Sequence, residues 1–183
     1  TREVPPGFQF LHCIENAVEG GWSRMSDGCA VGAAIEAEHP DGYYALTTLD
    51  WVFDNRSPDA EHRWIGPIND HGSRHQPLTL RSYYPVRSAP HLQIADVPRA
   101  YEALRVFAEV ARDPRFQISY PFRPGDLVGF DNRRVLHGRD AFTGTGDRHL
   151  RGCYADHDDI YSRLRVLRRP VRPATDRSLE VAT

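Results

Sequence analysis

The chain has 183 residues, of which 40% are hydrophobic, 10% aromatic and 26% charged. These fractions are typical of one globular domain and exclude a disordered chain. The net charge of -2 gives no indication of a nucleic-acid partner, and no apolar run approaches the roughly 20 residues that span a membrane. Three separated cysteines without a CxxC pair predict reduced thiols in a cytoplasmic protein: Cys13, Cys29 and Cys153.

The first 42 residues predict one strand and one helix. Residues 8–14 are mostly apolar and predict a strand that is buried on both faces. Residues 29–38 have a helical pattern, for which Ser26 or Asp27 can serve as the N-cap. The proline and glycine in residues 40–42 predict the end of that helix.

The middle of the chain predicts strands and one long helix. Residues 43–55 and 75–84 are rich in β-branched and aromatic residues, which favour strands. Turn formers dominate residues 56–76 and predict a long loop around a short strand. The clearest helix lies within residues 96–114, with Asp96 as its cap, a proline in its first turn and an apolar face.

The last third predicts short strands joined by turns. Their residues are 116–122, 127–132, 134–139, 149–155 and 160–168. With only two helices predicted, this succession favours a β-sandwich or jelly roll over a parallel α/β sheet. We therefore expect one mainly-β domain with flanking helices over residues 1–169, followed by a polar tail over residues 170–183.

Two side chains near the end of the chain are candidates for chemistry. His137 lies near the end of a predicted strand, and neutral imidazole is a good ligand for iron or zinc. Arg148 begins the next strand, and a guanidinium can fix a carboxylate through two parallel hydrogen bonds. If the two strands pair, both side chains can point into one cavity. A lone histidine in a strand or a lone arginine is more often structural, so these residues alone leave both interpretations open.

Two longer motifs indicate a family. "FDNRRVLHGR" and "DRHLRGCYADHDDIYSRLRVLR" closely resemble the C-terminal part of the γ-butyrobetaine and trimethyllysine dioxygenases. These are Fe(II)/2-oxoglutarate oxygenases of the branch that includes taurine dioxygenase. The resemblance covers residues 6–169, and it is dense over 8–28 and 122–167 but loose over about 50–94. It implies a double-stranded β-helix, a cupin-like jelly roll, which agrees with the strand-rich pattern.

The resemblance also implies roles for four residues. His137 matches the distal iron-binding histidine of a 2-His-1-carboxylate site, and Arg148 matches the arginine that binds the distal carboxylate of 2-oxoglutarate. Ser23 ends a segment that resembles the family's Gly-Gly-Asp-Ser/Thr, whose hydroxyl contacts the cosubstrate, although Trp22 replaces the acid. Tyr154 matches a wall of the aromatic cage that holds a trimethylammonium group.

The remaining metal ligands form a His-x-Asp motif, which the resemblance places upstream of Thr1; we therefore expect a jelly roll that is incomplete at its N-terminus. Two His-x-Asp sequences do occur, at residues 39–41 and 157–159. The first lies in a predicted turn that explains its residues without a metal. The second aligns with a region of the family that does not bind iron. We expect neither to bind a metal.

The resemblance implies an Fe(II)/2-oxoglutarate-dependent dioxygenase that uses O2 and hydroxylates a small trimethylammonium carboxylic acid. γ-Butyrobetaine is the first candidate, which would place the protein in carnitine biosynthesis. However, residues 80–87 read "LRSYYPVR", where butyrobetaine enzymes carry asparagines for the substrate carboxylate. Another small acid therefore stays open, such as trimethyllysine, a sulfonate or an amino-acid derivative, and so does a non-catalytic jelly-roll binding module. An ascorbate requirement and a homodimer are also left open.

Overall fold

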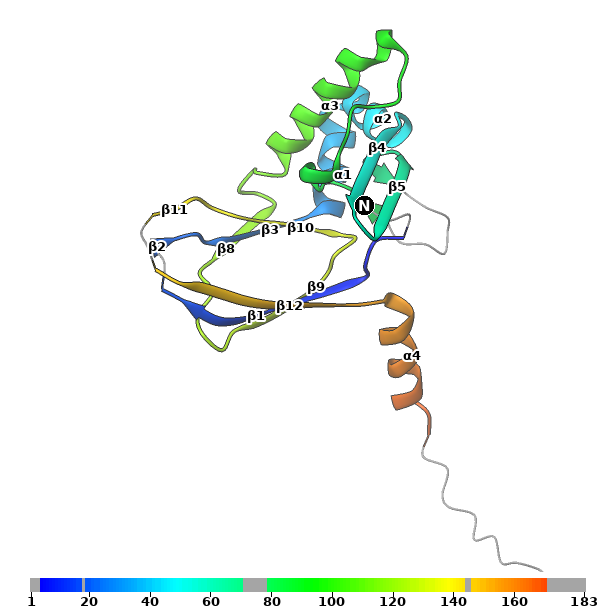
Figure 1. Ribbon diagram of the computed structural model, residues 1–183. Coiled ribbons are helices and arrows are strands. Elements are labelled where there is room, and N and C mark those ends of the chain that lie inside the picture. Colours follow the sequence, from blue (N-terminus) through cyan, green and yellow to red (C-terminus); the bar gives the residue numbers. More distant parts are fainter. Residues whose placement is uncertain (1–3, 18, 71–78, 144–145, 171–183) are drawn as a thin grey trace, which may run out of the picture.

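The computed structural model describes residues 4–17, 19–70, 79–143 and 146–170. Its strand half contains two antiparallel three-stranded sheets that face each other (Figure 1). One sheet has the order β12-β1-β9, and the other has the order β10-β3-β8. Their strands are β1 (Phe8–Asn16), β3 (Ser23–Asp27), β8 (Gln117–Tyr120), β9 (Leu127–Asp131), β10 (Val135–Arg139) and β12 (Arg148–Ala155). We call this pair of sheets the sandwich.

One end of the sandwich is formed by two very short strands. β2 (Glu19–Gly20) pairs with β11 (Phe142–Thr143) in antiparallel fashion. β2 follows β1, and β11 follows β10, so this small ladder joins one strand from each large sheet. The two sheets are therefore tied together at this end.

The first strand differs in part from its prediction. β1 pairs with β12 on one side and with β9 on the other, so it is the central strand of its sheet. Its register shifts between Cys13 and Glu15, which is a β-bulge. Cys13 is buried, whereas Ile14 is 38% exposed. The strand is confirmed, but the prediction that both of its faces are buried is wrong.

The first helix grows directly out of a strand. α1 (Gly28–Glu38) follows β3 without a loop, and the Asp27 carboxylate accepts a hydrogen bond from the Cys29 backbone N–H at 3.0 Å. An oxygen acceptor at this position satisfies one of the free N–H groups of the first turn. The predicted helix and its Asp27 cap are confirmed.

The segment after α1 corrects a prediction, because residues 43–48 are helical rather than extended. Pro40 ends α1 but also begins α2 (Pro40–Thr48), since proline fits the first turn of a helix. The β-branched Thr47 and Thr48 are accommodated because their hydroxyls donate to the carbonyls of Tyr43 and Tyr44 four residues earlier, at 3.0 and 2.6 Å. The predicted strand begins only at Trp51.

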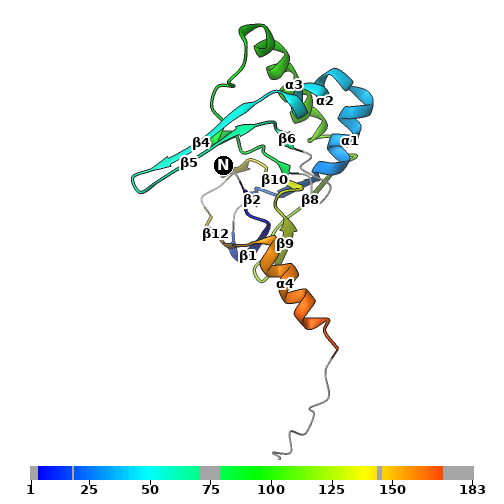
Figure 2. The same ribbon diagram turned by 90° about the vertical axis from the view of Figure 1, so that its right-hand side faces the viewer.

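A long hairpin and two short strands follow α2. β4 (Trp51–Ser57) pairs with β5 (Ala60–Gly66), and β6 (Asn69–Asp70) pairs with β7 (Thr79–Leu80). Figure 2 shows the hairpin extending from the helices beside the sandwich. Within the described part of the strand predicted over residues 75–84, only Thr79 and Leu80 (β7) pair as a strand. Pro85 lies in a 3-10 turn (η1, Tyr84–Val86), and residues 75–78 lie outside the described residues.

The long helix is confirmed as α3 (Val97–Val110), which follows a 3-10 turn (η2, Ile94–Asp96). Asp96 occupies the N-cap position, but its side chain makes no capping hydrogen bond. The predicted apolar face is present: Leu104, Phe107 and Val110 are buried, whereas Tyr101, which also belongs to the apolar pattern, is 51% exposed.

The last element is a helix rather than the strand predicted over residues 160–168. α4 (His157–Leu167) projects away from the sandwich (Figures 1 and 2). Apolar residues at 160, 164 and 167 recur at helical spacing, and acidic residues in the first turn favour a helix N-terminus. The described part of the chain thus has four α-helices where the pattern predicted two. None of them is long and apolar enough to cross a bilayer.

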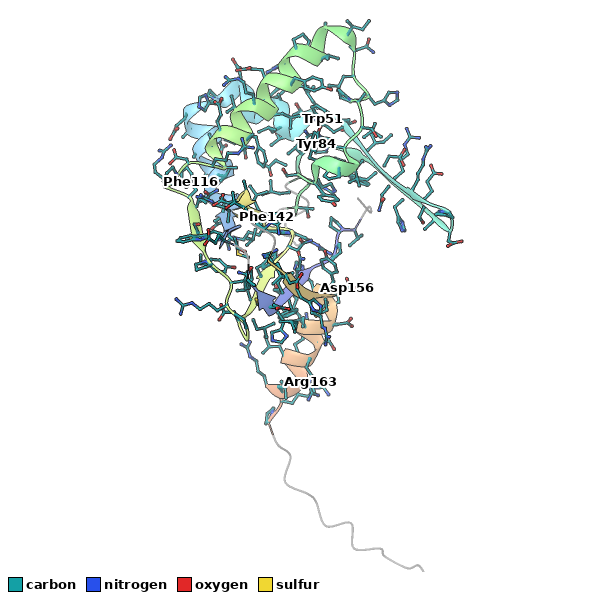
Figure 3. All side chains as sticks on the ribbon, turned by 60° about the vertical axis from the view of Figure 1, so that its left-hand side comes forward. Trp51, Tyr84, Phe116, Phe142, Asp156 and Arg163 are labelled. Carbon is teal, nitrogen blue, oxygen red and sulfur yellow. The ribbon has the colours of Figure 1, made fainter. Side chains whose placement is uncertain are left out.

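The apolar core lies among α1, α2, α3 and β4, which we call the helical layer. Trp51, Phe53 and Ile35 are at most 1% exposed, and they pack with apolar residues of all three helices. In Figure 3 Trp51 lies in this layer, whereas Arg163 of α4 lies at the opposite end of the described part of the molecule, with Asp156 between them. The helical layer packs against the outer side of the sheet that contains β10, because Leu136 packs against the same cluster.

Candidate active site

His137 lies between the two sheets of the sandwich. It is on β10, opposite Met25 of β3, and its ring centroid is 4.9 Å from that of Phe130 on β9 of the other sheet. The imidazole is accessible from this space, yet the surrounding protein atoms remove enough water to lower its pKa. Burial therefore favours the neutral imidazole, which is the form that binds a metal ion.

Arg148 is the first residue of β12 and lies opposite Asn16 of β1. Its Nε atom is buried and has no hydrogen-bond partner among the residues that the structure describes. Burial lowers the pKa of Arg148, and the nearby Arg139 lowers it further, while the Cys13 thiol has the opposite effect. A buried donor without a partner is costly, so an anionic group bound here would relieve that cost.

The sequence predicts that His137 and Arg148 can point into one cavity if their two strands pair. In the structure these two strands do not pair. β10 pairs with β3, whereas β12 pairs with β1, so the two residues belong to facing sheets. His137 lines a cavity of about 1310 Å³, and Arg148 is not among the residues that line it. The structure therefore brings both residues to the sandwich but does not place Arg148 in the wall of this cavity.

Ser23 is positioned by the glycines that precede it. Gly20 and Gly21 have φ angles of 77° and 62°, which residues with a side chain rarely adopt, and β3 begins two residues later. Ser23 is 6% exposed and lies opposite Arg139 of β10. Since alternate residues of a strand share a face, Ser23 lies on the same face of its sheet as Met25 and His137. Trp22, which replaces the family's acid, is 47% exposed.

Tyr154 lines the cavity together with His137. It is on β12 opposite Gln9, and its side chain is 60% exposed. Asp156 and Asp159, at the start of α4, line the same cavity. An aromatic face beside two carboxylates can attract a cation.

Another part of the cavity wall comes from segments that the sequence analysis did not assign to the site. It includes Leu104 and Phe107 of α3, Asn55 and His62 of the β4–β5 hairpin, and Arg81, Ser82, Tyr83, Tyr84 and Arg87 of the segment around η1. The one signal for this wall was the "LRSYYPVR" stretch, which departs from the family pattern. The helix and the hairpin gave no such signal, because Leu104 and Phe107 have the pattern of core residues, and Asn55 and His62 have that of an ordinary polar surface.

The two alternative His-x-Asp sequences lie at different places in the fold. Asp41 is fully exposed and lies 3.9 Å from Arg99. His157 is buried, with Nε2 3.2 Å from Asp131 Oδ1 and its ring 4.8 Å from that of Phe8. It therefore docks α4 onto the sandwich.

The described residues include side chains that fit part of a site for iron and 2-oxoglutarate. No group of three or more His, Cys, Asp and Glu residues within the described ranges could hold a metal ion. His137 fits one ligand position, and the unpartnered Nε of Arg148 fits a carboxylate of the cosubstrate. Together they could bind one end of a dicarboxylate and supply one ligand to a metal ion.

Comparison with known proteins identifies the family. Residues 1–154 match the model of the "Taurine catabolism dioxygenase TauD, TfdA family". The chain is 39% identical over 170 residues to a gamma-butyrobetaine dioxygenase of Pseudomonas sp. (strain AK-1), which covers 92% of this chain and 44% of that protein. It is 34% identical over 181 residues to human gamma-butyrobetaine dioxygenase, with 91% and 45% covered. The chain thus spans a little under half the length of these relatives.

A solved structure has the same fold. The crystal structure of a putative alpha-ketoglutarate dependent 2,4-D dioxygenase from Burkholderia xenovorans matches with a TM-score of 0.65 and 20% identity, covering 86% of this chain and 65% of that one. The predicted mainly-β jelly roll, a double-stranded β-helix with flanking helices, is confirmed. From the match over residues 1–154 and the two relatives, the chain belongs to the TauD, TfdA family of dioxygenases.

Proposed function

We propose that the protein containing this chain is an Fe(II)/2-oxoglutarate-dependent dioxygenase that uses O2 to hydroxylate a small trimethylammonium carboxylic acid. The observation that carries the proposal is the buried, unpartnered Nε of Arg148, in the sandwich that also holds His137. The substrate class is supported by similarity to two proteins named gamma-butyrobetaine dioxygenase, and γ-butyrobetaine is the first candidate.

The cosubstrate would be held by residues of both sheets. Arg148 would donate two charge-assisted hydrogen bonds to the distal carboxylate of 2-oxoglutarate, which fixes the orientation of the molecule. Ser23 would donate its hydroxyl hydrogen to the same cosubstrate from the facing sheet. Because both residues are anchored in strands, their donors are positioned before the cosubstrate arrives.

His137 would supply one nitrogen ligand to iron, and the other two ligands would come from outside the described residues. Phe130 packs against the imidazole and limits its rotation. Bound iron would supply the oxidation chemistry, and the protein would supply the positions of the reactants. Tyr154 would present its aromatic face to the trimethylammonium group, which has no N–H to donate and therefore favours a π-face over a hydrogen bond.

The test is succinate release by the full-length protein with Fe(II), 2-oxoglutarate and O2 across a panel of betaines and sulfonates. We expect γ-butyrobetaine to stimulate succinate release. Stimulation by another small acid alone would replace the substrate and keep the reaction class. No stimulation by any member, together with no 2-oxoglutarate binding, would favour a binding module that has lost catalysis.

A matched pair of variants tests the assigned role of Tyr154. Tyr154→Leu is expected to raise KM for the trimethylammonium acid, because the π-face is lost. Tyr161→Leu, which changes an exposed tyrosine of α4 outside the cavity wall, is expected to leave KM unchanged. An equal rise in both variants would remove Tyr154 from the site.

We also propose a cytoplasmic location. Cys13, Cys29 and Cys153 are free thiols in the structure, which supports the proposal because an oxidising compartment favours disulfides. Labelling of the thiols in freshly lysed cells tests it, and a mixed or intermolecular disulfide at any of the three would contradict it.

A further inference from the structure

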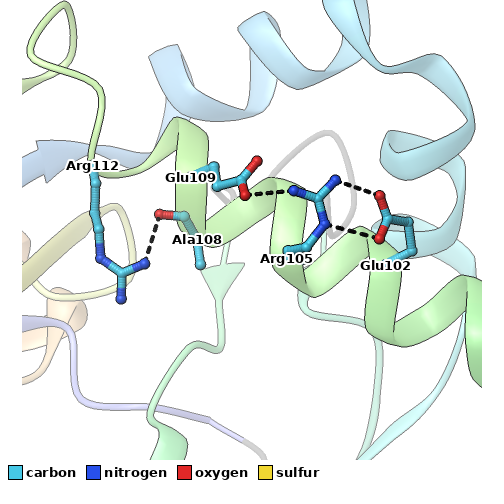
Figure 4. Close-up of polar contacts among 5 residues, drawn as sticks. All are labelled: Glu102, Arg105, Ala108, Glu109 and Arg112. Atoms are coloured by element: carbon cyan, nitrogen blue, oxygen red, sulfur yellow. Dashed lines mark hydrogen bonds and ion pairs between the residues drawn. The ribbon is translucent and has the colours of Figure 1, made fainter.

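Three arginines line the 1310 Å³ cavity, and Arg87 differs from the other two. The Nη1 atom of Arg81 lies 3.0 Å from the Asp70 carboxylate. Arg112 donates to the Ala108 carbonyl at 3.3 Å (Figure 4). The Arg87 guanidinium has neither an ion pair nor a hydrogen bond within the described ranges, and it lies over two aromatic rings.

Arg87 is held in place by its backbone and by two rings. Its N–H donates to the Tyr84 carbonyl at 3.1 Å, and the residue forms a β-bridge with Phe53 of β4. The guanidinium carbon lies 5.3 Å from the ring centroid of Trp51 and 5.6 Å from that of Tyr84. Since Trp51 is fully buried in the helical layer, it is a rigid support for the cation.

Burial lowers the pKa of Arg87, so its charge has lost part of its hydration. Arginine keeps its proton under such conditions, and a partly dehydrated cation without a carboxylate partner is costly. A ligand carboxylate in the cavity would supply the missing partner.

The cavity also has a part of opposite charge. Tyr154 and the carboxylates of Asp156 and Asp159 come from the β12–α4 segment, whereas Arg87 comes from the segment that is bridged to β4. Because both groups line one cavity, a zwitterionic ligand bound there can meet Arg87 with its acid and Tyr154, Asp156 and Asp159 with its cation.

We propose that Arg87 binds the acidic group of the substrate, and that the substrate is a small zwitterion whose cation lies near Tyr154, Asp156 and Asp159. This inference rests on the proposed function and deepens it, because it names the residue that would select acids over their neutral analogues. Arg148 then binds the cosubstrate, and Arg87 binds the substrate.

The experiment compares γ-butyrobetaine with its primary amide, which keeps the cation but lacks the acid. Binding of each to the full-length protein is measured by calorimetry under anaerobic conditions with Fe(II) and 2-oxoglutarate, in wild type and in Arg87→Met. We expect the variant to bind the acid about tenfold to hundredfold more weakly, as for the loss of hydrogen bonds to a charged group, and to bind the amide as the wild type does. Arg87→Lys should recover part of the affinity for the acid, because it keeps the charge.

Arg99→Met is the matched control. The Arg99 guanidinium also lies over a tyrosine ring, 4.9 Å from the centroid of Tyr44, but the residue does not line the cavity. Arg99→Met should therefore leave the affinities for γ-butyrobetaine and for its amide unchanged.

Equal losses for acid and amide in Arg87→Met would overturn the inference, since they would show a purely structural role. Equal affinity of the wild-type protein for the acid and for the amide would also overturn the inference. Succinate release is a separate readout: its absence with γ-butyrobetaine would remove the proposed substrate reaction, whereas the ratio of acid to amide affinity judges Arg87.

Discussion

The helical layer and the sandwich bury different kinds of side chain. In the layer, Ile35, Leu46 and Phe53 are at most 1% exposed and form one apolar cluster. In the sandwich, Gln9 and Ser23 are buried polar residues, and the Nε of Arg148 is buried without a described partner. The comparison indicates that apolar packing in the helical layer supports the sandwich, where buried polar groups can bind a ligand.

The largest expected effect is on stability in the helical layer. Phe53 is fully buried, so Phe53→Ala should lower the free energy of unfolding by about 3–5 kcal/mol through lost burial and the resulting cavity. Leu127→Ala in the sandwich is the control, because Leu127 is 65% exposed and should cost little. Urea unfolding of the full-length protein measures both. Similar losses would mean that the two regions do not differ in packing.

The next effect is on binding in the sandwich. Arg148→Ala should weaken 2-oxoglutarate binding about tenfold to hundredfold, because hydrogen bonds to a charged group are lost. The free energy of unfolding should stay the same or rise, since a buried donor without a described partner is removed. Arg151→Ala, an exposed position on the same strand, is the control. Unchanged 2-oxoglutarate affinity in Arg148→Ala would remove Arg148 from the cosubstrate site.

A smaller effect is expected where the two regions join. Asp27→Ala removes the cap of α1 and should cost about 1 kcal/mol. The hydrogen bond from Arg134 holds the pKa of Asp27 below its usual range. Stabilisation by the charged carboxylate is therefore complete above the usual aspartate value of about 4, and it is lost as the pH falls through the lowered pKa. The difference between wild type and variant in thermal unfolding should shrink in strong acid; a difference independent of pH would contradict this account.

The smallest effect is expected on the outer surface of α3. Figure 4 shows Arg105 between Glu102 and Glu109, with all three side chains more than half exposed. Exposed ion pairs contribute little because water screens them and the side chains must be ordered. Arg105→Ala should leave the unfolding midpoint unchanged at moderate salt, and a clear drop would show that this network supports the helical layer.

The sequence predicted those features that depend on a local pattern or a motif. It did not predict features that depend on contacts between distant residues. The cap at Asp27 and the strand at His137 follow from local chemistry, and the structure has both. The segment over residues 43–48 was predicted wrongly because two threonines favour a strand locally, while their hydroxyl bonds and a proline at the first turn allow a helix. Over residues 160–168 the sequence predicted a strand, because arginines alternate with apolar residues in the second half of this range. The apolar residues 160, 164 and 167 also have helical spacing, and the structure has the helix α4.

The candidate site shows the same limit. Motifs identified His137 and Arg148, but they could not show that the two strands belong to facing sheets. Arg87 was part of a stretch noted only for its difference from the family. Its bridge to Phe53 and its position over Trp51 depend on contacts between residues more than 30 positions apart, which local sequence patterns do not encode.

The direct passage from β3 into α1 has a consequence for how this fold can vary in evolution. A Cβ on Gly28 would lie 2.4 Å from the Arg134 carbonyl oxygen, so there is no room for a larger residue at the junction. An insertion here would turn Ser23 relative to the helices, whereas the exposed turn between β4 and β5 can lengthen without moving any strand of the sandwich. Homologues should therefore gain or lose residues in that turn and keep the length of the junction fixed.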